Sequence, residues 1–490
     1  MNYQSTRSPY INTDSAHAVL QGLAPDGGLY VLPDIPSLNF DWQGVLKKDY
    51  YEMAADILSA LLPDYSRDEA LSLARAAYAG KFSSPLLTPL CPVGEDAVLE
   101  LFHGPTSAFK DMALCLLPHL MKSAARKCGD SGDVLILTAT SGDTGKAAME
   151  GFRDVPGVRI IVFYPRAGVS PVQEAQMLSQ QGDNVKVCAV EGNFDDAQTG
   201  VKKIFASCGE SLRLSSANSI NVGRLVPQVV YYFSAYASML RLGRLSPGDK
   251  LDYVVPTGNF GDILAGYIAG LLGLPVGRLV CASNVNNVLT DFFNTGCYDR
   301  RRPFHPSLSP SMDILVSSNL ERLLYLLSGD CGLVSGLMSS LDRDMFYKLP
   351  PELLEKARSA FFAGFCDDSA TLETIASVWQ QHHYLMDTHT AVAWNVAQQY
   401  KAACPGHAPL VVMSTASPYK FPSAVAQALR LEHSGDDFEL MEAIRRSTGV
   451  PIPENLQGLA SRPRLHFDCV AKDAMAGYVL EKAGESSWKK

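Results

Sequence analysis

The stretch VLILTATSGDTG, residues 134–145, contains the pattern that decides the fold of this chain. Its first four residues form a short apolar run, and the polar, glycine-containing segment that follows leads into a helix predicted from Lys146. A strand that is apolar throughout is typical of a parallel sheet with both faces covered. The stretch therefore predicts one strand–loop–helix unit of an α/β protein.

The same unit recurs further along the chain, each time as a short apolar run followed by turn residues and a helical pattern. Because strands alternate with helices, we expect parallel sheets covered by helices on both faces. The further strands that this pattern predicts are residues 158–163, 185–190, 253–255, 279–281 and 410–413.

The first part of the chain has a different pattern. Turn residues at 25–28 are followed by apolar residues at helical spacing, such as Ala54, Ile57 and Leu58. We interpret this part as a mainly helical N-terminal cap that ends near residues 83–85.

Length and composition restrict the class of protein. A chain of 490 residues exceeds a single simple core, so we expect two or three domains. The net charge of −9 argues against nucleic acid or an anionic membrane as the main partner, which leaves a small molecule.

The eleven cysteines are scattered without a Cys-x-x-Cys pair, as expected for reduced thiols in a cytoplasmic protein. The longest apolar run, residues 263–276, is broken by glycines and a proline, so we predict a buried helix and no membrane span.

Lys110 is the candidate catalytic residue. It lies in FHGPTSAFKD, residues 102–111, where turn residues give way to an apolar helical pattern. Asp111 is well placed at the positive end of that helix. A lysine held beside backbone amides and screened from water can lose its proton and form a Schiff base with an aldehyde.

Four loops of polar or glycine-rich composition leave strand ends or helix starts, and they contain Lys110, Gly142, Gly258 and Thr415. Open parallel sheets bind ligands at the carboxyl ends of their strands, so we expect the four loops to converge on one crevice. The GNFGD loop, residues 258–262, can close its backbone N–H groups on a phosphate at a helix start. An ordinary tight strand-to-helix turn is the alternative interpretation of this loop.

Three other kinds of site are not expected. Residues 140–146 resemble a nucleotide P-loop, but Thr140 and Ala147 stand where that motif needs Gly and Ser or Thr. Such a loop can instead hold a substrate carboxylate with N–H and hydroxyl donors. His382, His383 and His389 lack a carboxylate or cysteine that would complete a metal set. The Gly-x-Ser-x-Gly elbow of a hydrolase is absent from the sequence.

Taken together, these motifs resemble the fold-type II enzymes of pyridoxal 5'-phosphate (PLP), and most closely the long class of threonine synthases. The resemblance extends over nearly the whole chain. It is carried by Ser5–Arg7, Gly22–Tyr30, Phe102–Thr106, Ala108–Asp111, Thr138–Gly145, Asn218–Asn221, Arg224, Leu225, Gln228, Pro256–Asp262, His389–Val392, Thr415, Ala416, Lys420 and Phe421.

The resemblance implies an α/β fold like that of the tryptophan synthase β subunit, with two open, mostly parallel sheets, flanking helices and an N-terminal, mainly helical cap. It implies a cap at residues 1–85, a large PLP-binding domain at 86–110 and 251–490 with a C-terminal extension, and a smaller α/β domain at 111–250. We expect a cytoplasmic monomer or homodimer that binds neither nucleic acid nor a membrane.

The resemblance also implies roles for individual residues. Lys110 would hold PLP covalently and act as the catalytic base. Thr415, or Ser414 beside it, would face the pyridine nitrogen, and a neutral hydroxyl there disfavours a charged ring nitrogen. The implied cofactor-binding residues are Lys110, Asp143, Gly258, Asn259, Phe260, Gly261, Asp262, Ser414 and Thr415. The implied substrate-binding residues are Thr106, Ser141 and Thr144 for the carboxylate, with Asn218, Ser219 and Arg224 for the phosphate.

The implied reaction converts O-phospho-L-homoserine and water to L-threonine and phosphate. One departure from the family pattern is visible, because this chain reads Thr415-Ala416-Ser417-Pro418 where many members read Thr-Ala-His-Pro. An alternative is therefore a threonine-synthase-like phospho-lyase that releases 2-oxobutanoate. A non-catalytic relative that has kept the fold is the third hypothesis.

Overall fold

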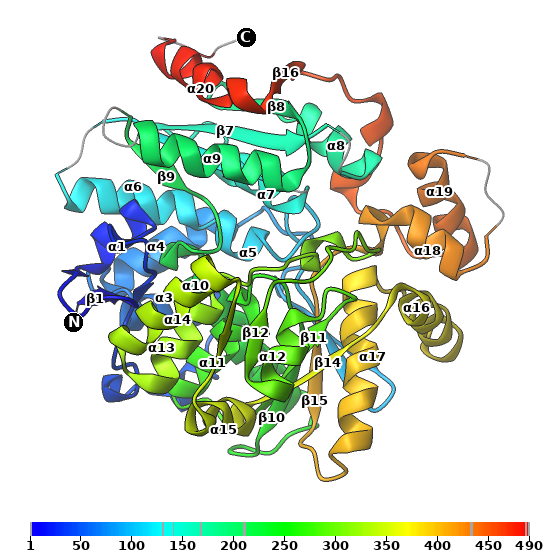
Figure 1. Ribbon diagram of the computed structural model, residues 1–490. Coiled ribbons are helices and arrows are strands. Elements are labelled where there is room, and N and C mark those ends of the chain that lie inside the picture. The colour runs from blue at the N-terminus through cyan, green and yellow to red at the C-terminus, as the bar shows by residue number, and fades with distance from the viewer. Residues whose placement is uncertain are drawn as a thin grey trace.

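A computed structural model describes residues 2–129, 132–140, 142–166, 169–208, 212–431, 435–485 and 488. Two sheets organise the fold, and Figure 1 shows them one above the other, with helices around both. The first has the strand order β14-β11-β10-β15-β5-β4, and the second has the order β16-β8-β7-β6-β9. All neighbouring strands in both sheets are parallel except β4 and β5. The predicted α/β class with two open, mostly parallel sheets is confirmed.

The first sheet is covered on both faces. Successive strand residues point to opposite faces, so Val254 packs under α17 while Tyr253 and Val255 pack toward α10 and α11. A row of aligned valines runs across the sheet beneath α17, namely Val98, Val412, Val254 and Val280. The strands are β4 (Leu90–Val93), β5 (Asp96–Glu100), β10 (Leu251–Pro256), β11 (Val276–Ser283), β14 (Phe361–Phe365) and β15 (Leu410–Ser414).

The second sheet is covered in the same way. Leu137, Ile161 and Val190 pack against α9 and α20, while Ile136 and Val162 face the core on the side of α7. The strands are β6 (Val134–Ala139), β7 (Val158–Pro165), β8 (Val185–Glu191), β9 (Leu214–Ser216) and β16 (Asp468–Ala471).

The N-terminal region is mainly helical, as predicted, and also contains a small antiparallel sheet. Its helices start at side-chain caps: Asp49 accepts a hydrogen bond from the N–H of Glu52, and Ser66 accepts one from Glu69. The elements are β1 (Tyr3–Ser5), β2 (Asn12–Thr13), α1 (Ser15–Gln21), β3 (Tyr30–Val31), η1 (Pro36–Leu38), α2 (Trp42–Val45), α3 (Tyr50–Leu61) and α4 (Arg67–Tyr78).

Helices surround both sheets, and within the described ranges no helix is both long and apolar enough to cross a bilayer. The helices up to the middle of the chain are α5 (Asp111–Leu114), α6 (Leu117–Lys127), α7 (Asp143–Phe152), α8 (Pro171–Leu178), α9 (Phe194–Cys208), α10 (Val222–Arg241), α11 (Gly261–Leu271) and α12 (Val288–Thr295).

The remaining elements complete the C-terminal half. They are β12 (Cys297–Asp299), η2 (Pro310–Met312), α13 (Leu320–Ser328), α14 (Cys331–Asp344), β13 (Phe346–Lys348), α15 (Pro351–Ala360), α16 (Asp368–His382), α17 (Thr388–Ala403), η3 (Pro418–Lys420), α18 (Pro422–Ala428), α19 (Asp437–Thr448), η4 (Glu454–Leu456), η5 (Leu459–Ser461), η6 (Lys472–Ala474) and α20 (Met475–Gly484).

One expectation needs correction, and another stays a prediction. The apolar run at 263–276 is not one helix, because α11 ends at Leu271 and β11 begins at Val276. Gly273, with a φ of 97°, and Pro275 separate the two elements. The domain boundaries stay a prediction, but β16 pairs with β8 in the second sheet and not with the first. The end of the chain therefore returns to the half of the molecule that contains residues 134–216 (Figure 1).

Candidate active site

Lys110 immediately precedes α5, as predicted, and its side chain is buried. Its Nζ donates a hydrogen bond to the Ser311 hydroxyl at 3.3 Å and lies 3.8 Å from the Asp143 carboxylate. Burial lowers the pKa of Lys110 to about 8, although the nearby Asp143 carboxylate acts in the opposite direction. A lysine of this kind has a usable fraction of neutral, nucleophilic amine near neutral pH.

The four predicted loops come together around this amine. The N–H of Phe109 donates a hydrogen bond to the carbonyl of Thr415 at 2.8 Å, so the Lys110 turn is held against the loop that follows β15. Ser311, the hydroxyl partner of Lys110, also packs against the glycine loop. A methyl group added at Gly258 would lie 2.7 Å from the Ser311 carbonyl oxygen. These loops therefore meet near Lys110, at the carboxyl ends of the strands.

The Gly258–Asp262 loop presents its N–H groups rather than its carbonyls. The carbonyl of Gly258 accepts a hydrogen bond from the Ser317 hydroxyl at 2.7 Å, and that of Asn259 accepts two from Asn319, one from its backbone and one from its side chain. Among the described residues, none accepts a hydrogen bond from the N–H groups of residues 259–261. Because these donors begin α11, they suit an anion at a positive helix end.

Phe260 fixes the shape of this loop. It has a φ of 64°, which is unusual for a residue with a side chain. Its ring is buried and stacks against Phe293 with centroids 6.0 Å apart. Core packing of the ring therefore compensates for a left-handed backbone conformation at the start of α11.

The Asp262 side chain does not face the crevice. Its carboxylate accepts hydrogen bonds from the hydroxyls of Tyr231 and Tyr232, at 2.6 and 2.9 Å. Burial raises the pKa of this carboxyl to about 6. Both tyrosines of α10 bond to Oδ1, while the buried Oδ2 of Asp262 has no hydrogen-bond partner among the described residues.

Arg224 lies deep in the site with unused hydrogen-bonding capacity. It is 3% exposed, donates one hydrogen bond to the Ala217 carbonyl, and its buried Nε has no partner in the described part of the chain. Burial lowers the pKa of Arg224 to about 10. The side chains of Asn218 and Ser219 likewise make no hydrogen bond with described residues. An anionic group is the ligand that such a set of donors would fit.

The Asp143 carboxylate has three polar neighbours, Lys420, Gln173 and Lys110. Its Oδ1 lies 2.7 Å from the Nζ of Lys420 and accepts a hydrogen bond from the Gln173 amide at 2.8 Å. Its Oδ2 faces Lys110. Although burial acts in the opposite direction, the two lysines hold the pKa of Asp143 well below its usual range. Asp143 is therefore a charged group inside the crevice, and Lys420, which had no predicted role, is its nearest cation.

The two hydroxyls after β15 differ in their surroundings. The Ser414 hydroxyl lies 2.9 Å from that of Thr390, so it belongs to a network under α17. Thr415 is buried, and its hydroxyl makes no hydrogen bond within the described residues. Of the two predicted partners for a ring nitrogen, this arrangement favours Thr415.

The residues predicted to hold a carboxylate are only partly free to do so. The hydroxyl of Thr106 donates a hydrogen bond to Asp111 at 2.7 Å, so its proton is already in use. Thr144 is half-buried at the start of α7 and makes no hydrogen bond with described residues. Ser141 lies outside the described residues. Thr144 thus remains the better-supported candidate of the three.

Ser311 and its supports were not predicted from the sequence. The backbone N–H of Ser311 donates a hydrogen bond to the Nε2 of His389 at 3.1 Å, and the other ring nitrogen lies 2.9 Å from Asp387. The ring of His389 is therefore fixed on both sides and belongs to the wall of the site. The only signal for Ser311 in the sequence was its place in a proline-punctuated polar segment.

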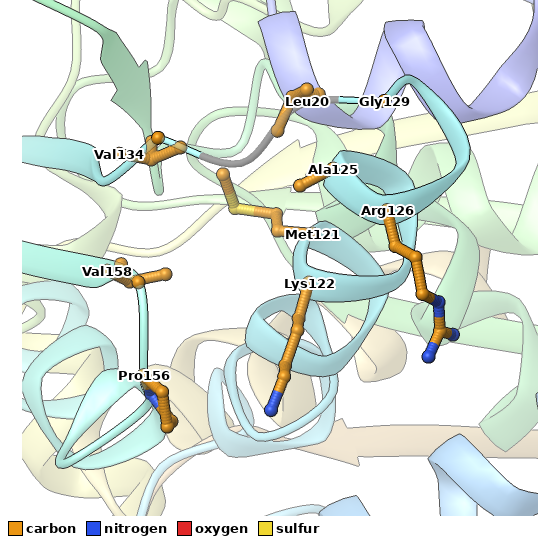
Figure 2. Close-up of a pocket in the computed structure, with 11 residues that line it drawn as sticks. Leu20, Met121, Lys122, Ala125, Arg126, Gly129, Val134, Pro156 and Val158 are labelled. Atoms are coloured by element: carbon orange, nitrogen blue, oxygen red, sulfur yellow. The ribbon is translucent and has the colours of Figure 1, made fainter.

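A separate cavity of about 410 Å³ lies at the end of the second sheet where β6 and β7 begin. Figure 2 shows that the Met121 side chain extends toward Val134 inside it, while the Lys122 side chain runs away from Val134. Val134 and Val158 are the first residues of β6 and β7, whereas the candidate site lies at the carboxyl ends of the strands. This cavity is therefore not part of the site around Lys110.

The site fits PLP on its own features: a buried lysine with a lowered pKa, free amides at a helix start for a phosphate, and an unpaired hydroxyl on Thr415. The fold and the site define a PLP-dependent enzyme of fold type II. The family model of the pyridoxal-phosphate dependent enzymes matches residues 94–416. Models for the N terminus and the C-terminal part of threonine synthase match residues 2–78 and 390–476. The chain belongs to the threonine synthase family.

Proteins named threonine synthase and proteins named threonine synthase-like 1 are both similar to this chain. Threonine synthase of Pseudomonas aeruginosa is 41% identical over 438 residues, which cover 87% of this chain and 90% of that protein. Human threonine synthase-like 1 is 39% identical, but the chain spans only 58% of the length of that relative. The crystal structure of PLP-bound threonine synthase from Brucella melitensis superimposes with a TM-score of 0.87 at 37% identity, covering 99% of this chain and all of that one.

Proposed function

We propose that this chain converts O-phospho-L-homoserine and water to L-threonine and phosphate, with PLP attached to Lys110. The observation that carries the proposal is the buried Lys110 amine, with its pKa lowered to about 8, in a crevice that also contains the open amides of residues 259–261. When bound, PLP supplies an electron-withdrawing ring that stabilises negative charge on the substrate. The protein's part is to hold, orient and transfer protons.

Lys110 is the proposed base in this reaction. A neutral amine can remove the proton from Cα of the substrate and then deliver a proton at the next carbon. The contact with the Ser311 hydroxyl orients the amine, and burial keeps bulk water from competing for its lone pair. Thr415 would pair with the ring nitrogen through its unpaired hydroxyl.

The two anionic groups of the ligands have separate proposed sites. The amides at the start of α11 would hold the cofactor phosphate, because they are open donors at a positive helix end. Arg224, with its orphan Nε, would bind the substrate phosphate together with Asn218 and Ser219. Thr144 and the start of α7 would receive the substrate carboxylate.

The product assay tests this proposal. Purified protein with PLP is incubated with O-phospho-L-homoserine, and threonine, 2-oxobutanoate and phosphate are measured together. Equal amounts of threonine and phosphate support the synthase. Phosphate release without threonine contradicts it, and so does a protein that never forms a borohydride-trappable PLP adduct at Lys110.

The second candidate function is a phospho-lyase that releases 2-oxobutanoate. Ser417 stands where the family pattern has a histidine, and its buried hydroxyl accepts a hydrogen bond from the N–H of Tyr419. The hydroxyl thus caps η3 and supplies no imidazole near the site. The similarity to the threonine synthase-like 1 proteins is compatible with this candidate. In the product assay, 2-oxobutanoate formed in equal amount to phosphate would identify it.

The setting of the reaction is also proposed. With a net charge of −9 and a small-molecule site, we propose a cytoplasmic enzyme that acts as a monomer or homodimer without nucleic acid. Gel filtration at enzyme concentrations used in the assay, with and without PLP, measures the oligomeric state directly.

A further inference from the structure

Lys420 is a completely buried lysine in the wall of the site. It ends η3, just after β15, and has 0% exposure. Its Nζ lies 2.7 Å from the Asp143 carboxylate and donates a hydrogen bond to the Thr106 carbonyl at 3.2 Å. A buried ammonium is tolerated only when it is paired and hydrogen-bonded, and Lys420 meets both conditions.

Asp143 faces two lysines but can neutralise only one positive charge. Its Oδ1 contacts Lys420, while its Oδ2 is 3.8 Å from Lys110. Lys110 has a neutral hydroxyl, that of Ser311, as its nearest acceptor. Lys420 is therefore the better-stabilised cation of the two, and a second proton in the same buried space would be uncompensated.

We propose that Lys420 is a positioning residue that occupies Asp143 and thereby leaves the ε-amine of Lys110 in its neutral, reactive form. The proposal rests on the proposed role of Lys110 and adds the group that sets the protonation of this amine. The same pair also joins η3, beside the first sheet, to α7, beside the second, so the charge balance depends on the two halves being correctly assembled.

The charges around Lys110 agree with this assignment. Burial is the main reason for the lowered pKa of Lys110; the Asp143 and Asp111 carboxylates raise it, and the Arg224 and Lys420 cations lower it further. Removing the Lys420 charge leaves the Asp143 carboxylate with Gln173 as a neutral partner and with Lys110 as its nearby cation. The pKa of Lys110 should then rise, which makes the amine less reactive at neutral pH.

The test measures the protonation of Lys110 without using catalysis. The full-length apoprotein is labelled with acetic anhydride between pH 6 and 11, and mass spectrometry follows the peptide that contains Lys110. For Lys420→Met we expect the labelling midpoint of Lys110 to rise by about one pH unit, with about tenfold less labelling at neutral pH. For Lys420→Arg, which keeps the charge, the midpoint should stay close to that of the unchanged protein.

Two further variants complete the design. Lys401→Met removes a lysine whose Nζ lies 2.8 Å from Asp96, outside the site, so it should leave the Lys110 midpoint unchanged. Asp143→Asn combined with Lys420→Met removes both charges of the pair, so the midpoint should return to the original value or fall below it. This double variant also gives a reading if Lys420→Met alone does not fold.

The outcomes separate this proposal from the proposed function. A folded Lys420→Met whose Lys110 midpoint is unchanged or lower would show that Lys420 is only structural. A double variant whose midpoint rises as far as that of Lys420→Met would also overturn the proposal. Neither result depends on threonine formation, while absence of a PLP adduct at Lys110 in the unchanged protein would refute the proposed function instead.

Discussion

Two strand-to-helix turns face each other across the crevice, and they present opposite groups. In the turn after β10, Ser317 and Asn319 donate hydrogen bonds to the carbonyls, which leaves the N–H groups open. In the turn after β6, the hydroxyl of Thr140 accepts hydrogen bonds from the N–H groups of Gly142 and Gly145, both at 2.9 Å. The first turn therefore offers donors to an anion, while the second has already used two of its own.

This difference shows that glycine content alone does not identify a phosphate site. Both turns contain two glycines and an aspartate near a helix start, so their compositions are alike. What separates them is which backbone groups neighbouring side chains occupy. The second turn also contributes the Asp143 carboxylate, which the two lysines keep charged.

The largest expected effect on activity comes from substitution of Lys110, which lies between the two turns. Lys110→Ala removes both the attachment point and the base, so kcat/KM should fall by about a thousandfold or more. Borohydride should no longer trap PLP on the protein. Lys110→Arg keeps a positive charge but cannot condense with an aldehyde. Activity that survives in Lys110→Arg would mean that Lys110 acts only through its charge.

A smaller effect, on stability and PLP affinity, is expected when a carbonyl in the turn after β10 loses a side-chain donor. Asn319→Leu removes the side-chain hydrogen bond to the Asn259 carbonyl, which keeps only the one from the Asn319 backbone, and it leaves the buried Arg322, which donates to the Asn319 side chain, short of a partner. The free energy of unfolding should fall by about 3 kcal/mol, and the Kd for PLP should rise at least tenfold. Urea unfolding and a PLP titration measure these changes. The matched control is Ser318→Ala, which removes only an exposed hydroxyl 3.4 Å from the Asn259 side chain; an equal effect there would contradict the assigned role of Asn319.

The two aspartates at the helix starts should respond oppositely to pH. Burial raises the pKa of Asp262 to about 6, so the folded state holds a proton that the unfolded state releases near pH 4. Its contribution to stability is complete below pH 4 and is lost as the pH rises to 6, by about 2–3 kcal/mol. Asp143, with its lowered pKa, contributes stability above pH 4 that is lost in stronger acid.

Unfolding midpoints in urea from pH 4 to pH 7 test this contrast. Asp262→Asn should lose less stability over this range than the unchanged protein, because the variant carries no titrating group there. If the two curves run parallel, the Asp262 carboxyl is already ionised in the folded protein at pH 4.

The smallest effect on stability is expected from a substitution in the turn after β6. Thr140→Val keeps the shape of the side chain but removes the acceptor of two N–H groups, which should cost about 1–2 kcal/mol of stability. Thr138→Val, two residues earlier on β6, is the matched control, because the buried Thr138 hydroxyl has no partner in the described part of the chain. Thermal unfolding should separate the two variants, and a greater loss in Thr138→Val would contradict the comparison of the turns.

The sequence predicted six strands from continuous apolar runs, because burial on both faces imposes that pattern. It missed β14, Phe361–Phe365, although that strand is apolar too. It also missed β16, whose residues Asp468–Ala471 are mostly exposed at an edge, and β5, which begins with an aspartate. In the site, the position of Lys110 followed from its local turn. The pairing of Lys420 with Asp143 joins segments far apart in the chain, so no local pattern could reveal it.

The sequence also could not predict the direction in which buried side chains point. Asp262 lies in the predicted loop, yet its carboxylate points to Tyr231 and Tyr232, and Thr106 donates its hydroxyl proton to Asp111. Residue type and spacing describe which groups are near a site. They do not determine which rotamer a buried side chain adopts when competing partners are available.

The pairing of β16 with β8 has a consequence for synthesis on the ribosome. Until residues 468–471 emerge, β8 presents an uncovered edge, and α20 is not yet there to shield the sheet. Unprotected parallel edges invite association between nascent chains. A chain stalled shortly before this point should therefore require a chaperone to stay dispersed, whereas a chain that includes β16 and α20 covers the β8 edge itself.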